Sequence, residues 1–286
     1  MRVEVLGSGG ATTTPRPLCT CAVCTEARAN GVPYARTGPA FFVHGPDVLI
    51  DTPEEIKYQL NRSQISRIAA CFYSHWHPDH TAGRRVFEEL NIDWRAWPRA
   101  PRGTTDVYLP EQVAVDFRER QGLWDHFEYM QQAERTVSVH ELADGEEVTL
   151  SGVAISSVRL AEDYVYAFLL EDGRKRVLIA PDELNGWSPP PEVWGVDLAV
   201  LPNGISEFDP RTGERAIHAD HDVLRTEATF DETLEIVKQL DAKRVVLAHI
   251  EEMDQLGYDD LVELERRLQA DGLQVSFAYD TLVVDV

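Results

Sequence analysis

The chain of 286 residues suits one large domain or two small ones, and its 43% of hydrophobic residues is enough for a substantial core. The formal net charge of −22 disfavours broad nucleic-acid binding, because an acidic surface repels phosphate backbones. No apolar run is long enough to span a bilayer, so we expect no membrane association. The first residues, "MRVEVLGSGG", indicate a strand and a glycine turn instead of a signal peptide, which favours a cytoplasmic location.

Strands and helices are predicted in alternation along the first half of the chain. Apolar residues in alternating or continuous runs predict strands at 2–7, 68–74, 106–110 and 136–142, and a hairpin at 39–51 with its turn at "HGPD". Helical periodicity predicts helices at 53–63, 81–91 and 111–130.

The second half continues the alternation. Strands are predicted at 146–160, 165–172, 175–182, 197–204 and 244–250, helices at 229–241 and 258–272, and a closing hairpin at 274–286. Residues 203–226 form a polar loop. No change in composition divides the halves, so we predict one α/β domain over residues 1–286, with sheets covered by helices.

The segment "SHWHPDHTAG" at 74–83 places His75, His77, Asp79 and His80 directly after a predicted buried strand. Imidazoles and carboxylates are the usual ligands of zinc, iron and manganese. A turn between a buried strand and a helix can direct alternate side chains to one point. The pattern therefore predicts a metal site, and a chance surface cluster is the weaker alternative.

Three of the four cysteines, Cys19, Cys21 and Cys24, lie in "CTCAVC", within a loop at 15–30. Such tight spacing disfavours a network of disulfides and favours a cluster of metal-bound thiolates. Three thiolates bind zinc and leave one tetrahedral position for another ligand. The alternative is three reduced thiols without a metal.

The order of these features resembles the metallo-β-lactamase fold superfamily over most of the chain. The resemblance includes the glycine turn at 7–10, Asp51 in "VLIDT", the "HWHPDH" cluster, Asp182 in "VLIAPD" and His249 in "VVLAHI". It implies a four-layer αββα sandwich with a two-metal site at one edge. Most members of this superfamily are hydrolases.

The resemblance also implies a role for each of these residues. The first metal would be held by His75 and His77, the second by Asp79, His80 and His249, and Asp182 would bridge both. Asp51 would support the histidine loop. An N-cap role for Asp182 and a satisfied buried histidine at 249 are the plainer alternatives, but each residue follows a predicted buried strand.

The stretch "GSGGATTTPRPLCTCAVC" narrows the resemblance to two groups. These are the cyclic-phosphate phosphodiesterases of phosphonate breakdown and the B proteins of pyrroloquinoline-quinone biosynthesis. Both use C-x-C-x-x-C in a structural zinc site. The phosphodiesterases add a histidine where this chain has Glu252, so Glu252, Asp254 or a residue elsewhere would complete the site. The glycines at 7–10 are weak evidence for a phosphate cradle, since a tight turn explains them.

One expected ligand of the first metal is missing. Relatives supply a further histidine before the bridging aspartate, and the corresponding stretch "SVRLAEDYVYAF" has Glu162 or Asp163 there instead. We predict Glu162 as the replacement ligand. Carboxylate in place of imidazole shifts preference from zinc toward manganese or iron, and it weakens attraction for a dianionic phosphate.

The residue near the leaving group also differs from the resembling enzymes. Their histidine is replaced by Glu227 in "RTEATFDET". His218 and His221, in the loop at 203–226, are alternative proton donors or ligands, although a solvated loop also explains them.

These features together predict a binuclear metal-dependent hydrolase that acts on a small molecule. The resemblance alone implies a small phosphodiester as the substrate. Asp79 would orient the nucleophile, and Glu227, His218 or His221 would protonate the leaving group. The expected cofactors are two divalent metals (Zn, Mn or Fe) and one structural zinc. The alternatives are an ester, lactone or thioester hydrolase, a non-catalytic binding protein, or an iron-dependent redox enzyme. A homodimer is expected from the resembling families alone.

Overall fold

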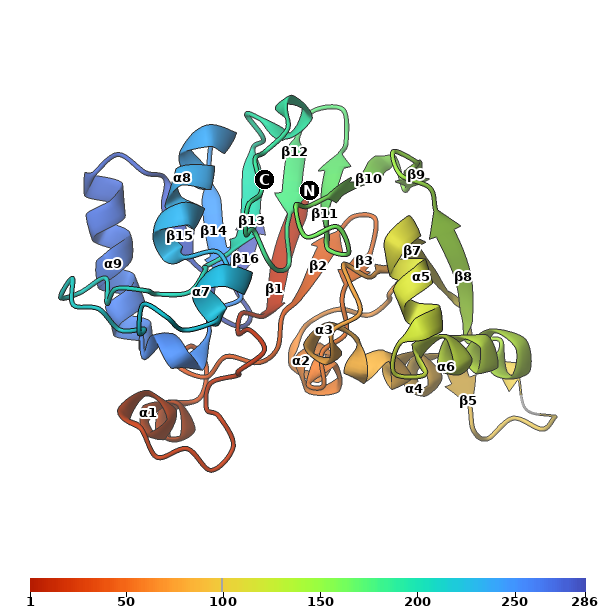
Figure 1. The fold of residues 1–286 in the computed structure, drawn as a ribbon. Helices are drawn as coiled ribbons and strands as arrows, with labels where there is room; N and C mark the ends of the chain where they lie inside the picture. Colours follow the sequence, from red (N-terminus) through yellow and green to blue (C-terminus); the bar gives the residue numbers. More distant parts are fainter. Residues whose placement is uncertain (99) are drawn as a thin grey trace.

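The computed structural model describes residues 1–98 and 100–286, and most of them belong to two large sheets (Figure 1). The first sheet has the order β16 (Val283–Asp285), β1 (Arg2–Gly7), β2 (Ala40–His44), β3 (Val48–Ile50), β4 (Ala70–Phe72), β7 (Thr105–Pro110), β8 (Val137–Leu142). The second has the order β15 (Val275–Phe277), β14 (Val245–Ala248), β13 (Leu198–Pro202), β12 (Arg176–Ile179), β11 (Tyr166–Glu171), β10 (Val153–Arg159), β9 (Glu147–Leu150). A small hairpin pairs β5 (Ile92–Asp93) with β6 (Ala100–Pro101).

Helices lie outside the sheets and along their edges (Figure 1). They are α1 (Ala22–Asn30), α2 (Ile56–Arg62), α3 (Pro78–Thr81), α4 (Val86–Asn91), α5 (Glu111–Glu119), α6 (Leu123–Tyr129), α7 (Val223–Thr226), α8 (Phe230–Leu240) and α9 (Tyr258–Ala270). No helix in residues 1–98 and 100–286 combines the length and the apolar character that a membrane crossing requires.

Three apolar layers separate four layers of secondary structure. In β12, Val177 and Ile179 join the core between the two sheets, whereas Leu178 joins the core beneath α8 and α9. In the first sheet, Cys71 of β4 packs in a core that includes Phe117 of α5. Because successive strand residues point to opposite faces, these continuous apolar strands are buried on both sides. The predicted αββα sandwich is therefore confirmed.

Two predicted helices are divided, and the backbone explains both breaks. The helix expected at 81–91 becomes α3, a 3₁₀ turn at 82–85 and α4. At Gly83 the chain passes so close to residue 53 that a Cβ would lie 2.1 Å from the Pro53 carbonyl oxygen. The helix expected at 111–130 divides into α5 and α6, because Gln121 and Gly122 adopt left-handed backbone angles.

The strands that matter for function are parallel. Strands β3, β4, β7 and β8 run parallel within the first sheet, and β12, β13, β14 and β15 do so within the second. Parallel strands present their carboxyl ends at one edge of a sheet, which is where ligands bind in such folds.

The packing between the two sheets predicts the effect of a core truncation. Phe168 of β11 is fully buried, and its ring centroid lies 5.5 Å from that of Phe72 in the opposite sheet. We expect Phe168→Ala to lower the free energy of unfolding by about 3–5 kcal/mol, because it removes an aromatic side chain and leaves a cavity. Urea denaturation monitored by circular dichroism measures this change.

Tyr58→Ala, at a side chain that is 70% exposed, is the control and should change stability by less than about 0.5 kcal/mol. An equally small loss for Phe168→Ala would contradict this description of the core.

Candidate metal centre

Four strand ends deliver the polar residues of the centre. Asp51 follows β3, and His75 follows β4 by three residues. Asp182 follows β12 by three residues, and His249 follows β14 directly. Because these strands come from both sheets, the centre lies where the carboxyl edges of the two sheets meet.

Six side chains form two adjacent groups of possible metal ligands. In each group the ligand atoms lie within 4.8 Å of one another; the groups are His75, His77 and Asp182, and Asp79, His80 and His249. Asp182 contacts both groups, since its Oδ2 lies 3.3 Å from His75 Nε2 and its Oδ1 lies 3.3 Å from His249 Nε2. This is the geometry expected of a bridging carboxylate.

Asp51 holds the histidine loop in place. This fully buried carboxylate accepts hydrogen bonds from Ser74 N at 2.8 Å and from Ser74 Oγ at 2.6 Å, and it lies 2.8 Å from His80 Nδ1. Ser74 Oγ in turn lies 3.0 Å from His75 Nδ1. With Nδ1 engaged, both imidazoles direct Nε2 into the centre, as is usual for metal-binding histidines.

The donor atoms fit divalent cations. The Nε2 atoms of His75, His80 and His249 are buried and have no hydrogen-bond partner among the described residues. A buried polar atom without a partner is costly, and a cation in each group would satisfy these imidazoles together with the carboxylates of Asp79 and Asp182. The first group has three donors, His75, His77 and Asp182. The second has four, because Asp79 adds a carboxylate to His80, His249 and the shared Asp182.

The charges of the centre also favour a cation. Burial alone would lower the pKa of His249, but Asp182 and Asp79 raise it to about 9. Burial would raise the pKa of Asp182, but the neighbouring imidazoles hold it well below its usual range. Burial and His75 lower the pKa of His77 to about 4, so this imidazole is neutral. A metal must therefore displace a proton from His249 at neutral pH, but none from His77.

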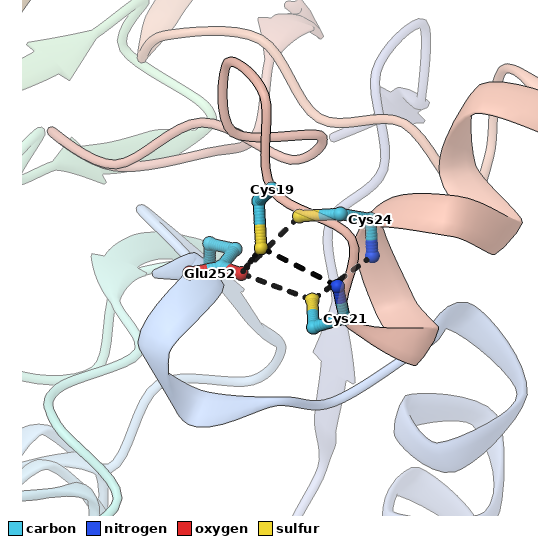
Figure 2. A group of neighbouring side chains, drawn as sticks. All are labelled: Cys19, Cys21, Cys24 and Glu252. Atoms are coloured by element: carbon cyan, nitrogen blue, oxygen red, sulfur yellow. Dashed lines mark hydrogen bonds between the residues drawn. The ribbon is translucent and has the colours of Figure 1, made fainter.

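A second cluster lies at the N-terminal loop, where three thiols surround one carboxylate oxygen (Figure 2). Glu252 Oε1 lies 3.4 Å from Cys19 Sγ and 3.2 Å from Sγ of both Cys21 and Cys24. Asp254 instead accepts a hydrogen bond from Ser206 N at 2.8 Å. Of the two carboxylates considered from the sequence, Glu252 is thus the one that faces the thiols, in a set of donors that suits tetrahedral zinc.

Three predicted site residues are not among the gathered donors. The side chain of His218 is 79% exposed, and His221 is also exposed; their Nδ1 atoms accept hydrogen bonds from Asp220 N and Val223 N of their own loop. Their predicted catalytic role is not supported by this arrangement, because a polar loop held by local bonds keeps them in solvent. Glu162 is half-buried in the turn before β11, and its carboxylate belongs to neither group of gathered donors, so its ligand role stays a prediction.

Glu227 lies beside the centre, and its predicted role as proton donor stays a prediction. It lines a small cavity together with Asp182, Glu183, His249 and Glu251. Burial raises its pKa to about 10, and a hydrogen bond with Glu183 adds to this effect. The Glu183 carboxylate is itself fixed, since its Oε1 accepts hydrogen bonds from Ala228 N at 3.1 Å and from Asn185 N.

The sequence did not identify three residues of the centre, namely Tyr164, Glu183 and Glu251. The Tyr164 ring centroid lies 5.7 Å from that of His77 and 6.2 Å from that of His75, beside the group with fewer donors. The only available signal was proximity in sequence: each lies within two residues of a predicted ligand.

Comparisons with known proteins agree with this geometry. The sequence profile of the beta-lactamase superfamily domain matches residues 45–250. The chain belongs to the metallo-β-lactamase superfamily. No curated protein matches the sequence significantly.

Three solved structures are similar over the whole chain. A diphosphatase from the PhnP family is 25% identical, with a TM-score of 0.72, and the match covers 100% of this chain and 97% of that one. Zinc-bound PqqB from Methylobacterium extorquens is 17% identical, with a TM-score of 0.74 and complete coverage of both chains. The short form of human tRNase Z is 19% identical, with a TM-score of 0.63, and the match covers 100% of this chain and 99% of that one. The predicted kinship with the phosphodiesterases of phosphonate breakdown, here the PhnP family, and with the B proteins of pyrroloquinoline-quinone biosynthesis, here PqqB, is confirmed.

The two donor groups predict a metal content that mutation should change. We expect the double variant His77→Ala/His80→Ala to lose the active-site metal and keep its fold, because each metal position loses an imidazole. Inductively coupled plasma mass spectrometry of protein purified without added metal measures this, with circular dichroism as the test of folding.

The matched control is His126→Ala/His140→Ala, which removes two histidines that pair with Glu88 and Asp106 away from the cluster. An unchanged metal content in the His77/His80 variant would show that these residues are not ligands.

The cysteine cluster predicts a zinc that stabilises the fold. Cys21→Ser should release one zinc per chain and lower the melting temperature, because binding to a structural site contributes directly to folding. Glu252→His keeps a donor at the fourth position and should retain the zinc. Zinc analysis and differential scanning calorimetry check both variants; a wild type without this zinc, or an unchanged melting temperature for Cys21→Ser, would refute the prediction.

Proposed function

We propose that the protein is a metal-dependent hydrolase whose substrate is a small phosphodiester. The observation that carries this proposal is the pair of donor groups sharing Asp182, placed beside a cavity that Glu227 lines. The similarity to a diphosphatase of the PhnP family supports phosphoryl transfer as the type of reaction.

The residues of the two groups would hold the metals. The first position would use His75, His77 and Asp182, and the second would use Asp79, His80, His249 and the same Asp182. Two divalent cations bound there would supply a water of lowered pKa and would stabilise negative charge developing on the phosphoryl oxygens. Asp79, whose Oδ2 lies 3.2 Å from His80 Nε2, stays ionised and can accept a hydrogen bond from the attacking water.

Glu227 is the proton donor to the leaving group in this proposal. With its pKa raised to about 10, the carboxyl group carries a proton at neutral pH. Glu183 orients it through the hydrogen bond between the two side chains. A protonated carboxyl group in an apolar or acidic site is a recurring general acid, because its environment keeps the proton until the leaving oxygen takes it.

The charge of the cavity favours a diester over a monoester. Asp182, Glu183 and Glu251 supply carboxylates beside the protonated Glu227, and the described lining residues include no lysine or arginine. A phosphate monoester carries two negative charges near neutral pH, whereas a diester carries one. Electrostatic repulsion therefore weakens binding of the monoester more.

Substitution of Glu227 tests both the reaction and the acid. Metal-loaded wild type should hydrolyse bis(p-nitrophenyl) phosphate faster than p-nitrophenyl phosphate. Glu227→Gln should lower kcat about 10²–10⁴-fold for a diester with an alkyl leaving group, and far less for a p-nitrophenyl leaving group, which departs without a proton. For the alkyl diester, the wild-type rate should fall at alkaline pH as Glu227 loses its proton, since the acid is active only while protonated, and the variant should lack this fall.

Glu128→Gln, at an exposed helix position, is the control and should leave both rates unchanged. An equal loss for both leaving groups would exclude Glu227 as the acid. Absence of phosphodiester hydrolysis with zinc, manganese or iron would exclude the proposed function, and iron with a visible absorption band would instead favour redox chemistry.

A further inference from the structure

The segment after β14 connects the active-site group to the cysteine cluster. His249 belongs to the active-site group with Asp79 and His80, and Glu252, three residues later, belongs to the cysteine cluster. His249 has a left-handed backbone angle (φ +51°), which is unusual for a residue other than glycine and must be held by its surroundings.

The glycine turn of the N-terminal loop holds this segment. Ile250 N donates a hydrogen bond to Ser8 O at 2.9 Å, and Glu252 N donates one to Thr12 O at 3.1 Å. The backbones of residues 8–12 and 249–252 therefore lie side by side. The glycine turn thus packs against a segment that carries a metal ligand.

Glu251 joins the same two segments through its side chain. Its buried carboxylate accepts hydrogen bonds from Ala11 N and Thr12 N, each at 2.9 Å. Two bonds to a fixed backbone leave the carboxylate little freedom. Its Oε1 lies 3.7 Å from His249 Nδ1, on the side of the ring opposite to Nε2, which faces Asp182.

Gly10 makes this arrangement sterically possible. A Cβ at position 10 would lie 2.2 Å from Glu251 Oε1 and 2.7 Å from His249 Nδ1, both closer than real Cβ atoms approach. An alanine there would push the carboxylate, the imidazole or both out of place. Close approach to these two side chains, in addition to the turn itself, therefore explains the glycine.

We propose that Glu251 is a positioning residue for His249, with Gly10 providing the space, and that the pair sets the affinity of the second metal position without affecting the first. The inference rests on the metal-binding part of the proposed function and is independent of hydrolysis. Partners of metal-bound histidines commonly change metal affinity 10–100-fold when removed, because they set the orientation and basicity of the ring.

The test separates the two metal positions by background mutations. His77→Ala weakens the first position and leaves the second intact, and His80→Ala does the reverse. Zinc affinity is measured in each background by competition with a chromophoric chelator, with and without Glu251→Gln, Glu251→Ala or Gly10→Ala. We expect about 10–100-fold weaker binding in the His77→Ala background for Glu251→Ala and Gly10→Ala, and a smaller loss for Glu251→Gln, which retains an acceptor oxygen.

In the His80→Ala background the same changes should have no effect. Gly103→Ala, at an exposed glycine where an added Cβ would lie 3.4 Å from Asn91 Oδ1 in ordinary contact, and Glu128→Gln are the matched controls. Circular dichroism of the metal-free variants tests folding, and Glu251→Gln carries the test if Gly10→Ala does not fold.

Equal losses in the two backgrounds, or no loss in either, would overturn the role of Glu251. Failure of the wild type to bind zinc at the two groups would overturn both this inference and the proposed function. Zinc binding that depends on Glu251 in a protein that hydrolyses no phosphodiester would refute the proposed function alone.

Discussion

Asp182 is the residue on which the arrangement of the centre depends, because its two oxygens face imidazoles delivered by different sheets. His75 comes from the strand end of the first sheet and His249 from that of the second. Burying a carboxylate is costly unless charges or hydrogen bonds compensate. The compensation here requires both sheets to present their carboxyl ends at the same edge and in the correct register. The packing of the two sheets therefore sets the positions of Asp182, His75 and His249, and the contacts of Asp182 with both histidines in turn favour this packing.

The acidic surroundings give metals an electrostatic role as well as a chemical one. Glu183, Glu227 and Glu251 surround a cavity in which the described residues provide no permanently charged cation. Protons on His80 and His249 and on the glutamate pair reduce the negative charge when no metal is bound. Metal binding replaces the protons on the imidazoles, so metal affinity, protonation and stability are linked in this region.

The sequence predicted those parts of the centre that short-range patterns encode. The cluster at 75–80 is local, and Asp51, Asp182 and His249 each end a strand whose apolar run is visible in the sequence, so their convergence follows from the parallel topology. Glu252 and Asp254 could not be separated in advance, because both lie in one 3₁₀ turn and only tertiary contacts show which faces the thiols. Tyr164, Glu183 and Glu251 were missed for the same reason. The breaks at Gly83 and at residues 121–122 depend on local backbone geometry that helical periodicity does not report.

The segment at 249–252 shows why the N-terminal loop and the metal centre belong to one structural unit. Its backbone hydrogen bonds to residues 8 and 12 align it with the N-terminal loop. The Glu251 carboxylate accepts hydrogen bonds from Ala11 N and Thr12 N, and Glu252 contacts the cysteine thiols in the part of the loop after residue 12. A strained backbone angle at His249 persists only where neighbouring contacts enforce it. These contacts come from residues more than 200 positions away in the chain, so the geometry of this ligand is complete only after the N-terminal loop has docked. A zinc at the cysteine cluster would hold the loop on the far side of the same segment, and the position of His249 would then depend on contacts at both ends.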